Sequence, residues 1–304
     1  MKAVQYKDYG NPDVLKRVDD ALIPVCGPHE IRIKVVCAGI NPFDVKKRSG
    51  MMSKGHPLDA PIIPSTEASG IVDALGSQVT DTKIGDAVFG FAFGGAACEY
   101  ALLSQWSHKP DNVSFETAGS VLVSAHAALR ALNELDLKQG NTLFVHGGSG
   151  GVGQATIQMA IAKGLSVIAD GSEKNQALIQ SLGATPIRYG EHLVRDVYAH
   201  APNGIDGIVD TSGTQLEDLL TIAKTPLKIR TLANYDGPSF GVKIPSYPKD
   251  SKQLLDEITG YLADGRLKVK VTGKFTLDQA QEAHRFVQTQ HTSGRSVFII
   301  NENL

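Results

Sequence analysis

The chain has 304 residues, of which 42% are hydrophobic and 20% charged, and its formal net charge at pH 7 is −2. This length predicts about two domains with sizeable cores, and the charge favours neither nucleic acid nor a membrane surface as a partner. The N-terminus shows no signal-peptide pattern, and no apolar run is long enough to span a bilayer. The three cysteines have no paired spacing and indicate a reducing compartment, so we expect a cytoplasmic protein.

The first hundred residues have the pattern of antiparallel β structure. Apolar and polar residues alternate at 2–5 and 30–37, as they do in strands with one buried face. Residues 71–75 and 86–93 predict two further strands. Glycine and proline mark the turns between these segments.

From residue 115 onward the pattern changes to alternating helices and strands. The expected elements are 118–135, 142–146, 152–163, 165–170, 174–182, 191–200, 207–210, 215–223 and 227–233. Such alternation implies α/β structure with a doubly wound parallel sheet.

The last part of the chain contains shorter elements. They are a strand at 242–244, a helix at 250–262, a strand near 269–271, a helix at 277–288 and a strand at 295–300. We expect the last three to return to the first domain. Residues 1–118 and 262–304 then form a mainly antiparallel domain, and residues 119–261 form a nucleotide-binding domain inserted into it.

A glycine-rich loop lies between the strand at 142–146 and the helix that follows. Gly148, Gly150 and Gly153 match G-x-G-x-x-G in the required strand-to-helix context. A dinucleotide needs this arrangement because its diphosphate must come close to backbone N–H groups at a helix N-terminus. The second strand at 165–170 follows at the expected distance and favours this interpretation over a flexible turn.

The same loop permits a different interpretation. Residues 147–151 also match G-x-S-x-G, the turn that presents the nucleophilic serine of many hydrolases. Ser149 would then be the nucleophile, with Asp210 and either His284 or His291 as its partners. No spacing supports these partners, and the serine hydrolase remains an alternative.

Several stretches carry a family resemblance that runs nearly from end to end. They are residues 38–50, 67–72, 85–90, 95–100, 145–153, 181–184, 210–213 and 293–297. In this order they resemble the medium-chain dehydrogenase/reductase superfamily, in particular its zinc-independent quinone oxidoreductase and enone reductase branch. The resemblance implies a Rossmann sheet inserted in a GroES-like catalytic domain, and hydride transfer from a nicotinamide cofactor to a quinone or an α,β-unsaturated carbonyl. It also implies a homodimer joined through the strand at 242–244.

The resemblance also implies that no metal is bound. Zinc members of the superfamily place a cysteine at Asn41, a histidine at Thr66 and the third ligand near Val123. None of these three side chains offers the thiolate or imidazole that zinc favours. Without a Lewis acid to stabilise an alkoxide, reduction of an electron-poor acceptor is expected rather than alcohol dehydrogenation.

Two residues are catalytic candidates by resemblance. Asn41 would line the nicotinamide site, although it could equally be a turn residue before a proline. Lys46 would stabilise the oxyanion that develops on the acceptor, or it could be a solvated lysine. A lysine at this position is typical of enone reductases. Asp44 and Arg48 have the i, i+4 spacing of an ion pair within a helix.

Cofactor selection depends on the register at the end of the strand 165–170. Asp170 lies at the spacing of the acid that binds the ribose of NAD, whereas the family register selects Gly171, followed by Ser172 and Lys174 for a 2′-phosphate. Successive strand residues point to opposite faces, so the register decides, and we predict NADPH without excluding NADH. The other expected cofactor contacts are Ser124, Gly148, Ser149, Gly150, Gly151, Val152, Gly153, Tyr189, Ser212, Ala233, Tyr235 and Arg295. A non-catalytic NADPH-binding or sensor protein is the second alternative.

Overall fold

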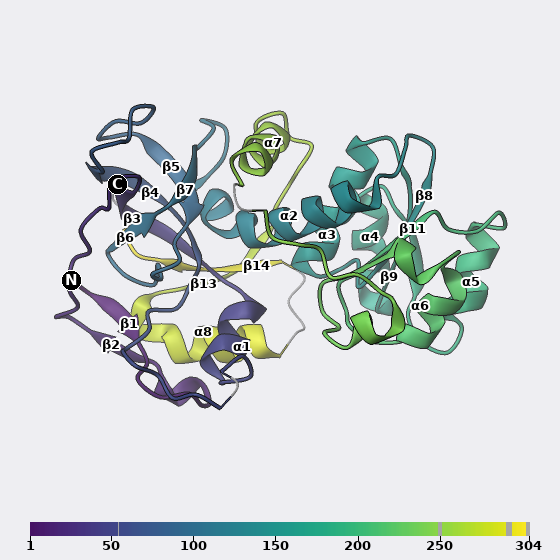
Figure 1. The fold of residues 1–304 in the computed structure, drawn as a ribbon, viewed down its shortest axis with the longest axis horizontal. Coiled ribbons are helices and arrows are strands. Elements are labelled where there is room, and N and C mark those ends of the chain that lie inside the picture. Colours follow the sequence, from purple (N-terminus) through teal and green to yellow (C-terminus); the bar gives the residue numbers. More distant parts are fainter. Residues whose placement is uncertain (54, 249–250, 290–293, 302–304) are drawn as a thin grey trace. The chain divides into compact units, whose positions relative to one another are not determined.

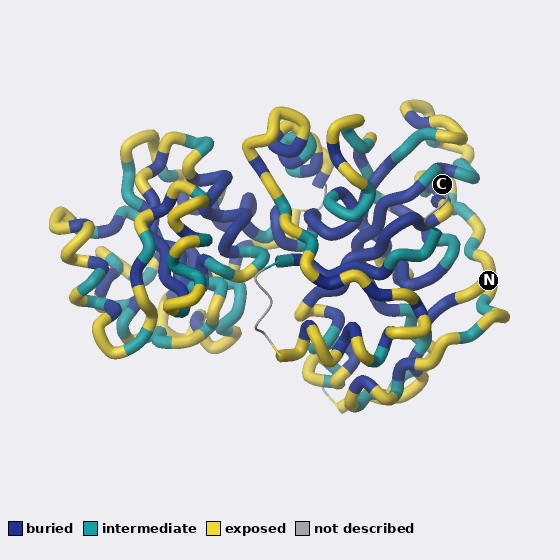
Figure 2. Tube along the Cα trace, turned by 180° about the vertical axis from the view of Figure 1, so that it is seen from behind, coloured by how far each residue is buried: buried dark blue, intermediate teal, exposed yellow. Residues whose placement is uncertain are grey.

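The structure is a computed structural model that describes residues 1–53, 55–248, 251–289 and 294–301. The chain divides into two compact units (Figure 1). Unit 1 contains Met1–Val123, Ser251–Ala263 and Val269–Leu304, and unit 2 contains Ser124–Asp250 and Asp264–Lys268. In each unit the buried residues gather at the centre (Figure 2). No helix in the described residues is long and apolar enough to cross a membrane.

Unit 1 is built on a mainly antiparallel sheet of seven strands in the order β13-β14-β3-β4-β5-β7, with β6 paired to β3. A separate pair, β1-β2, accompanies it. The strands are β1 (Ala3–Gln5), β2 (Lys16–Val18), β3 (Ile31–Ile40), β4 (Glu67–Leu75), β5 (Ala87–Phe91), β6 (Tyr100–Leu103), β7 (Gln105–His108), β13 (Val271–Phe275) and β14 (Arg295–Ile299). Only the β13–β14 pairing of the large sheet is parallel, which confirms the antiparallel β prediction.

The alternation of the sequence accounts for β3. Ile31, Ile33 and Val35 are fully buried, whereas the charged residues between them point to the other face. The helical segments of unit 1 are η1 (Pro12–Val14), α1 (Pro42–Arg48), α7 (Lys252–Ala263), η5 (Leu277–Gln279), α8 (Ala280–Gln288) and the first part of α2 (Phe115–Leu135).

Unit 2 is built on five strands in the order β10-β9-β8-β11-β12, all of them parallel. The strands are β8 (Thr142–His146), β9 (Ser166–Gly171), β10 (Thr185–Arg188), β11 (Gly207–Asp210) and β12 (Ile229–Thr231). The helical segments are α3 (Gly151–Ala162), η2 (Glu173–Asn175), α4 (Gln176–Ser181), α5 (Leu193–His200), α6 (Leu216–Ile222), η3 (Pro226–Lys228) and η4 (Gly237–Phe240). This topology confirms the doubly wound parallel sheet.

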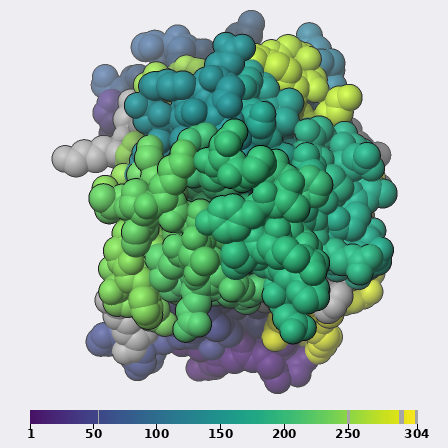
Figure 3. Space-filling view, turned by 90° about the vertical axis from the view of Figure 1, so that its right-hand side faces the viewer, coloured from purple at the N-terminus to yellow at the C-terminus, as the bar shows by residue number. Residues whose placement is uncertain are grey.

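The core of unit 2 explains why its helices pack as they do. Phe144 and Ile168 of the sheet join Leu193 and Val197 of α5 and Leu219 of α6 in one apolar cluster. The apolar face of each helix is thereby removed from water. The outer surface of these helices forms much of the face of unit 2 seen in Figure 3.

Two expectations about residues 242–262 need correction. Residues 242–244 do not form a strand, since only Lys243 pairs with Arg230 in a single bridge and Val242 is buried in the core of unit 2. The edge strand expected at a dimer interface was therefore wrong, and the homodimer stays a prediction. The helix expected at 250–262 is α7, and Asp250 lies outside the described residues. We expected most of this helix in the nucleotide-binding domain, whose predicted end is residue 261, but α7 is grouped with unit 1. Ser107 of β7 contacts Asp256 of α7 at 3.4 Å.

Candidate functional site

The glycine-rich segment connects β8 to α3 by a tight turn. The N–H of Gly148 donates to the carbonyl oxygen of Asp170 at 2.8 Å, which fastens the turn to the end of β9. A Cβ on Gly153 would lie 2.2 Å from the carbonyl oxygen of Gly147, so only glycine allows α3 to approach this closely. Gly150 caps α3 without a side-chain hydrogen bond, and the first N–H groups of a helix have no intrahelical acceptor. The turn therefore presents backbone donors that can bind a diphosphate.

Most of the predicted cofactor residues of unit 2 gather at one edge of its sheet, because the carboxyl ends of parallel strands meet there. The turn after β8 contains Gly148, Ser149 and Gly150, and α3 begins with Gly151, Val152 and Gly153. Gly171 ends β9, and Ser172 follows it. The residues after β10, β11 and β12 include Tyr189, Ser212, Ala233 and Tyr235. Ser124 is buried in α2. The edge has the position of a dinucleotide site in an open α/β sheet.

The end of β9 shows where the candidate residues for cofactor selection lie. Asp170 is fully buried, and Gly171 is the last residue of the strand. Beyond it, the hydroxyl oxygen of Ser172 is buried without a hydrogen-bond partner among the described residues, and Lys174 is exposed. The side-chain amide of Gln176 donates to backbone carbonyl oxygens on both sides of this turn, including that of Gly171 at 2.9 Å. Glu173 lies between Ser172 and Lys174 and is also exposed, and its carboxylate is paired with Arg188. The end of β9 is thus followed by a hydroxyl, an ammonium group and an ion-paired carboxylate.

A histidine binds the buried carboxylate of Asp170. Nδ1 of His146 lies 2.5 Å from Oδ2 of Asp170, and the N–H of Gly147 donates to Oδ1 at 2.6 Å. Nε2 of His146 lies 3.1 Å from Oγ1 of Thr214. Burial alone would lower the pKa of His146, but the hydrogen bond to Asp170 and the charges of Asp170 and Asp210 raise it overall. His146 and Asp170 therefore form a buried ion pair beneath the glycine-rich turn.

A second buried polar cluster lies in unit 1 around the carboxylate of Glu67, which is fully buried. It accepts hydrogen bonds from the side-chain amide of Asn41 at 2.8 Å, from the guanidinium of Arg295 at 3.0 Å and from the N–H of Val123 at 2.9 Å. Arg295 also donates to the carbonyl oxygen of the Asn41 side chain. A Cβ on Gly39 would lie 2.4 Å from Glu67, so glycine is needed beside this carboxylate. The carboxylate of Glu67 and the guanidinium of Arg295 together fix the orientation of the Asn41 amide.

Asp44 holds Asn41 from the backbone side. Its carboxylate accepts the N–H of Asn41 at 2.7 Å and that of Ser65 at 3.2 Å, and Ser65 has the left-handed φ of 72°. Burial raises the pKa of Asp44 to about 7. The expected ion pair between Asp44 and Arg48 is wrong, because Asp44 turns back to cap the helix while Arg48 donates to Gln288 at 3.4 Å.

Comparison with known proteins agrees with this architecture. An alcohol dehydrogenase GroES-like domain model matches residues 27–134, and a zinc-binding dehydrogenase model matches residues 182–298. The chain belongs to the medium-chain dehydrogenase/reductase superfamily, in its quinone oxidoreductase branch. It is therefore a member of an oxidoreductase family, and unit 1 corresponds to the expected GroES-like domain.

Three relatives illustrate the similarity. The chain is 29% identical to a chloroplastic NADPH-dependent alkenal/one oxidoreductase of Arabidopsis thaliana, over 98% of this chain and 79% of the relative. It is 28% identical to the quinone oxidoreductase of Mus musculus, over 97% and 96%. The structure of the quinone oxidoreductase from Coxiella burnetii is 27% identical and superimposes with a TM-score of 0.84, covering 99% of both chains.

Within this medium-chain dehydrogenase/reductase, unit 1 holds the other predicted site residues. Lys46 is half-buried on α1, one turn after the Asn41 cap. Arg295, expected at the cofactor, is buried and directed to Asn41 and Glu67; its contact with the cofactor stays a prediction. Sequence reasoning missed Glu67 and Asp44 as partners of Asn41. Glu67 could have been found as a carboxylate at the start of an apolar stretch, and Asp44 as an acid three residues after a helix cap.

The positions of the zinc ligands are filled by other groups. Asn41 donates to Glu67, Thr66 follows the left-handed Ser65, and Val123 contributes only its backbone N–H. In the described part of the chain, no group of three or more His, Cys, Asp or Glu residues could hold a metal ion.

The hydrolase alternative finds no geometric support in the described residues. Asp210, its nominated acid, accepts the N–H groups of Ser212 and Gly213 and the hydroxyl of Thr231. His284 is fully buried in unit 1, and neither of its ring nitrogens has a hydrogen-bond partner in the part of the chain that the structure describes. His291 lies outside the described residues.

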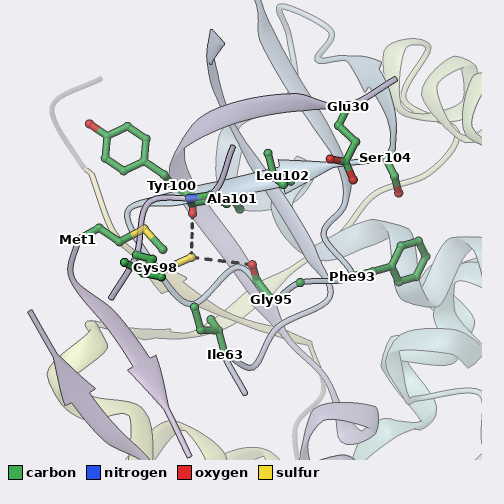
Figure 4. A pocket seen from close by; sticks show the side chains of 13 residues that line it. Met1, Glu30, Ile63, Phe93, Gly95, Cys98, Tyr100, Ala101, Leu102 and Ser104 are labelled. Atoms are coloured by element: carbon green, nitrogen blue, oxygen red, sulfur yellow. Dashed lines mark hydrogen bonds between the residues drawn. The ribbon is translucent and has the colours of Figure 1, made fainter. Parts of the chain in front are cut away.

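Unit 1 also contains a cavity of about 220 Å³ near the N-terminus (Figure 4). Its lining includes Met1, Phe93 and Cys98 and none of the predicted site residues. The thiol of Cys98 donates to the carbonyl oxygen of Tyr100 at 3.1 Å, and burial raises its pKa to about 12. All three cysteines are free, and this one is buried as an unreactive thiol.

Proposed function

We propose that the protein is a zinc-independent, NADPH-dependent oxidoreductase that reduces a quinone or an α,β-unsaturated carbonyl. The observation that carries the proposal is the carboxyl edge of the unit 2 sheet, where a glycine-rich turn is followed by a strand end that offers Ser172 and Lys174 and withdraws Asp170. The printed names of the Arabidopsis and mouse relatives, an NADPH-dependent alkenal/one oxidoreductase and a quinone oxidoreductase, support the same chemistry.

The residues of unit 2 fit the cofactor. The unpartnered hydroxyl of Ser172 and the exposed ammonium of Lys174 can bind a 2′-phosphate. The N–H groups of the glycine-rich turn can bind the diphosphate. We assign the remaining contacts to Ser124, Tyr189, Ser212, Ala233 and Tyr235. When bound, NADPH supplies a hydride, that is, a proton with two electrons.

Asn41 and Lys46 are the proposed catalytic residues. Reduction of the acceptor carbon or oxygen leaves negative charge on oxygen, and preorganised donors lower the energy of that charge. Asn41 suits this role because Glu67 and Arg295 fix its amide before substrate binds. The ammonium of Lys46 would add a positive charge, and water or Lys46 would deliver the proton.

Zinc is not part of the proposed reaction. The three family positions hold an amide, a hydroxyl and an aliphatic side chain, which do not fit the nitrogen and sulfur ligands of zinc in this family. The amide of Asn41 is in addition occupied by Glu67 and Arg295. A conjugated acceptor needs no such Lewis acid, because its own π system spreads the developing charge.

The first experiment measures binding and turnover separately. NADPH fluorescence is titrated with the purified protein, and NADPH oxidation is followed with a panel of quinones and enones. Gly150→Val should abolish binding and leave the fold intact, since the nearest atom to a Cβ at Gly150 is 3.6 Å away. Binding by this variant equal to that of the native chain would contradict the diphosphate site. Tight binding without turnover on any acceptor would favour the sensor alternative.

The second experiment concerns the proposed oxyanion donor. Lys46→Ala should lower kcat by about tenfold or more and change the affinity for NADPH less, because Lys46 acts on charge that develops only in the reaction. Lys47→Ala, the neighbouring helix position, is the matched control. Equal turnover of the two variants would remove Lys46 from the mechanism.

A further inference from the structure

The ion pair of His146 and Asp170 stands at the strand ends where the cofactor is proposed to bind. The two residues occupy the last position of β8 and the next-to-last position of β9, and they are 1% and 0% exposed. Each oxygen of Asp170 has a donor, the imidazole of His146 for one and the N–H of Gly147 for the other. The carboxylate is therefore occupied before any ligand arrives.

Asp170 is nevertheless the residue at the spacing of a ribose-binding acid. Dinucleotide-binding folds that select NAD place a carboxylate about 20 residues after the glycine-rich turn, where it accepts the ribose 2′-hydroxyl. The same carboxylate disfavours a 2′-phosphate, because like charges at short range repel. The direction of the Asp170 side chain is thus the feature that separates the two cofactors.

We propose that His146 determines cofactor preference, by binding Asp170 and keeping its carboxylate away from the adenosine ribose. This inference rests on the proposed NADPH-dependent function. With Asp170 withdrawn, Gly171 ends β9, and Ser172 and Lys174 follow it without a negative charge. The remaining carboxylate of this turn, that of Glu173, is paired with Arg188, which offsets its charge.

The surroundings explain why the histidine is needed. Phe144 and Ile168 precede His146 and Asp170 on the same face of the sheet and belong to the apolar core of unit 2. A buried carboxylate without a partner is strongly disfavoured in such a core, and Asp210 nearby adds a second negative charge. If the imidazole were removed, Asp170 would gain most by turning toward water at the carboxyl edge, where the dinucleotide is proposed to bind.

A hydroxyl chain holds the imidazole in this orientation. Nε2 of His146 contacts Thr214 at 3.1 Å, and the Thr214 hydroxyl lies 2.8 Å from that of Ser212. Ser212 and Thr214 are exposed, so the outer ring nitrogen is fixed by groups at the surface. With both nitrogens engaged, the ring has one favoured orientation, in which Nδ1 faces Asp170. His146 is a positioning residue that acts through Asp170.

The experiment compares the affinities of the full chain for NADPH and NADH by fluorescence titration. We expect His146→Leu to lower the ratio of NADPH to NADH affinity by about tenfold, comparable with one charge-assisted hydrogen bond. His146→Asn, which keeps an N–H donor near Asp170, should retain most of the preference. The double variant His146→Leu/Asp170→Asn should restore the ratio, because no carboxylate remains to turn outward.

Asp170→Asn alone tests the same idea in a conservative variant and covers the case in which His146→Leu does not fold. It should keep the native ratio within about twofold; a marked loss of NADH affinity alone would show that Asp170 binds the ribose and would overturn the inference. An unchanged ratio in folded His146→Leu would overturn it as well. A native chain that binds neither dinucleotide would instead contradict the proposed function.

Discussion

The buried cluster of unit 1 makes a quantitative prediction for Arg295→Met. Arg295 supplies the positive charge beside Glu67, and their side chains are 9% and 0% exposed. The substitution keeps the length of the side chain and leaves Glu67 buried with only the Asn41 amide and the Val123 N–H as donors. Removing one partner of a buried ion pair costs about 3–5 kcal/mol of unfolding free energy. We expect a comparable loss in unit 1, together with reduced turnover because the Asn41 amide is no longer fixed.

Trp106 provides the assay. It is the single tryptophan of the chain and lies in β7 of unit 1, so its fluorescence reports unit 1 even if the two units unfold separately. Urea is preferable to guanidinium because it adds no salt. For a slope of about 2–3 kcal/mol per molar urea, the loss corresponds to a midpoint lower by roughly 1–2.5 M.

Two controls separate the buried charge from general damage. Glu67→Gln/Arg295→Met removes both charges and should recover more than half of the loss, which a double-mutant cycle measures. Lys274→Met breaks a surface pair with Glu116, whose side chains are 55% and 34% exposed, and should cost less than about 1 kcal/mol. If Arg295→Met shifts the midpoint no further than Lys274→Met, the reasoning about the buried pair is refuted.

Two further predictions concern buried groups of unit 1. Burial raises the pKa of Asp44 from 3.8 to about 7, so the folded state favours the protonated carboxyl group. The contribution of this group to the free energy of unfolding is fully present below pH 3.8 and is lost as the pH rises through about 7. The urea midpoint of the native chain should therefore fall between pH 4 and pH 7 more steeply than that of Asp44→Asn, and parallel curves would contradict this. Among the cysteines, half-buried Cys26 should react first with a thiol reagent at pH 8, whereas Cys37 and Cys98 are buried and should react only on unfolding; rapid labelling of Cys98 in the native chain would contradict its assignment as an unreactive thiol.

The fold could be predicted where hydrophobic periodicity was strong. The alternation at Ile31, Ile33 and Val35 predicted β3, and the strand–glycine–helix order predicted β8 and α3. β6 and β7 were missed because only Ser104 separates them, so no turn signal divides the segment. β10 was missed because Pro186 argues against a strand, although it is tolerated here at the edge of the sheet.

The parts of the site that could be predicted are those that depend on residues close together in the sequence. The glycines predicted the turn between β8 and α3 and its backbone donors, since both depend only on the local backbone. The role of Asp170 could not be predicted, because its partner His146 lies 24 residues earlier on a neighbouring strand and the pairing of β8 with β9 decides whether they meet. Helical spacing paired Asp44 with Arg48. Asp44 instead accepts the N–H of Asn41, because a backbone N–H at the start of a helix has no acceptor within the helix.

The buried acids narrow the proton chemistry of the proposed reaction. Asp44, Glu67, Asp170 and Asp210 all lie near predicted site residues, and each accepts hydrogen bonds from two or more groups within its own unit. A carboxylate engaged in this way holds backbone and side chains in place, and it would lose those bonds if it left to serve an acceptor. Burial raises the pKa of Asp44 to about 7, so this acid can hold a proton near neutral pH, but its oxygens face the N–H groups of Asn41 and Ser65. We therefore expect the proton that completes reduction to come from Lys46 or from water. This suits a quinone or an enone, whose reduced oxygen is basic enough to take a proton from either source without a dedicated carboxylic acid.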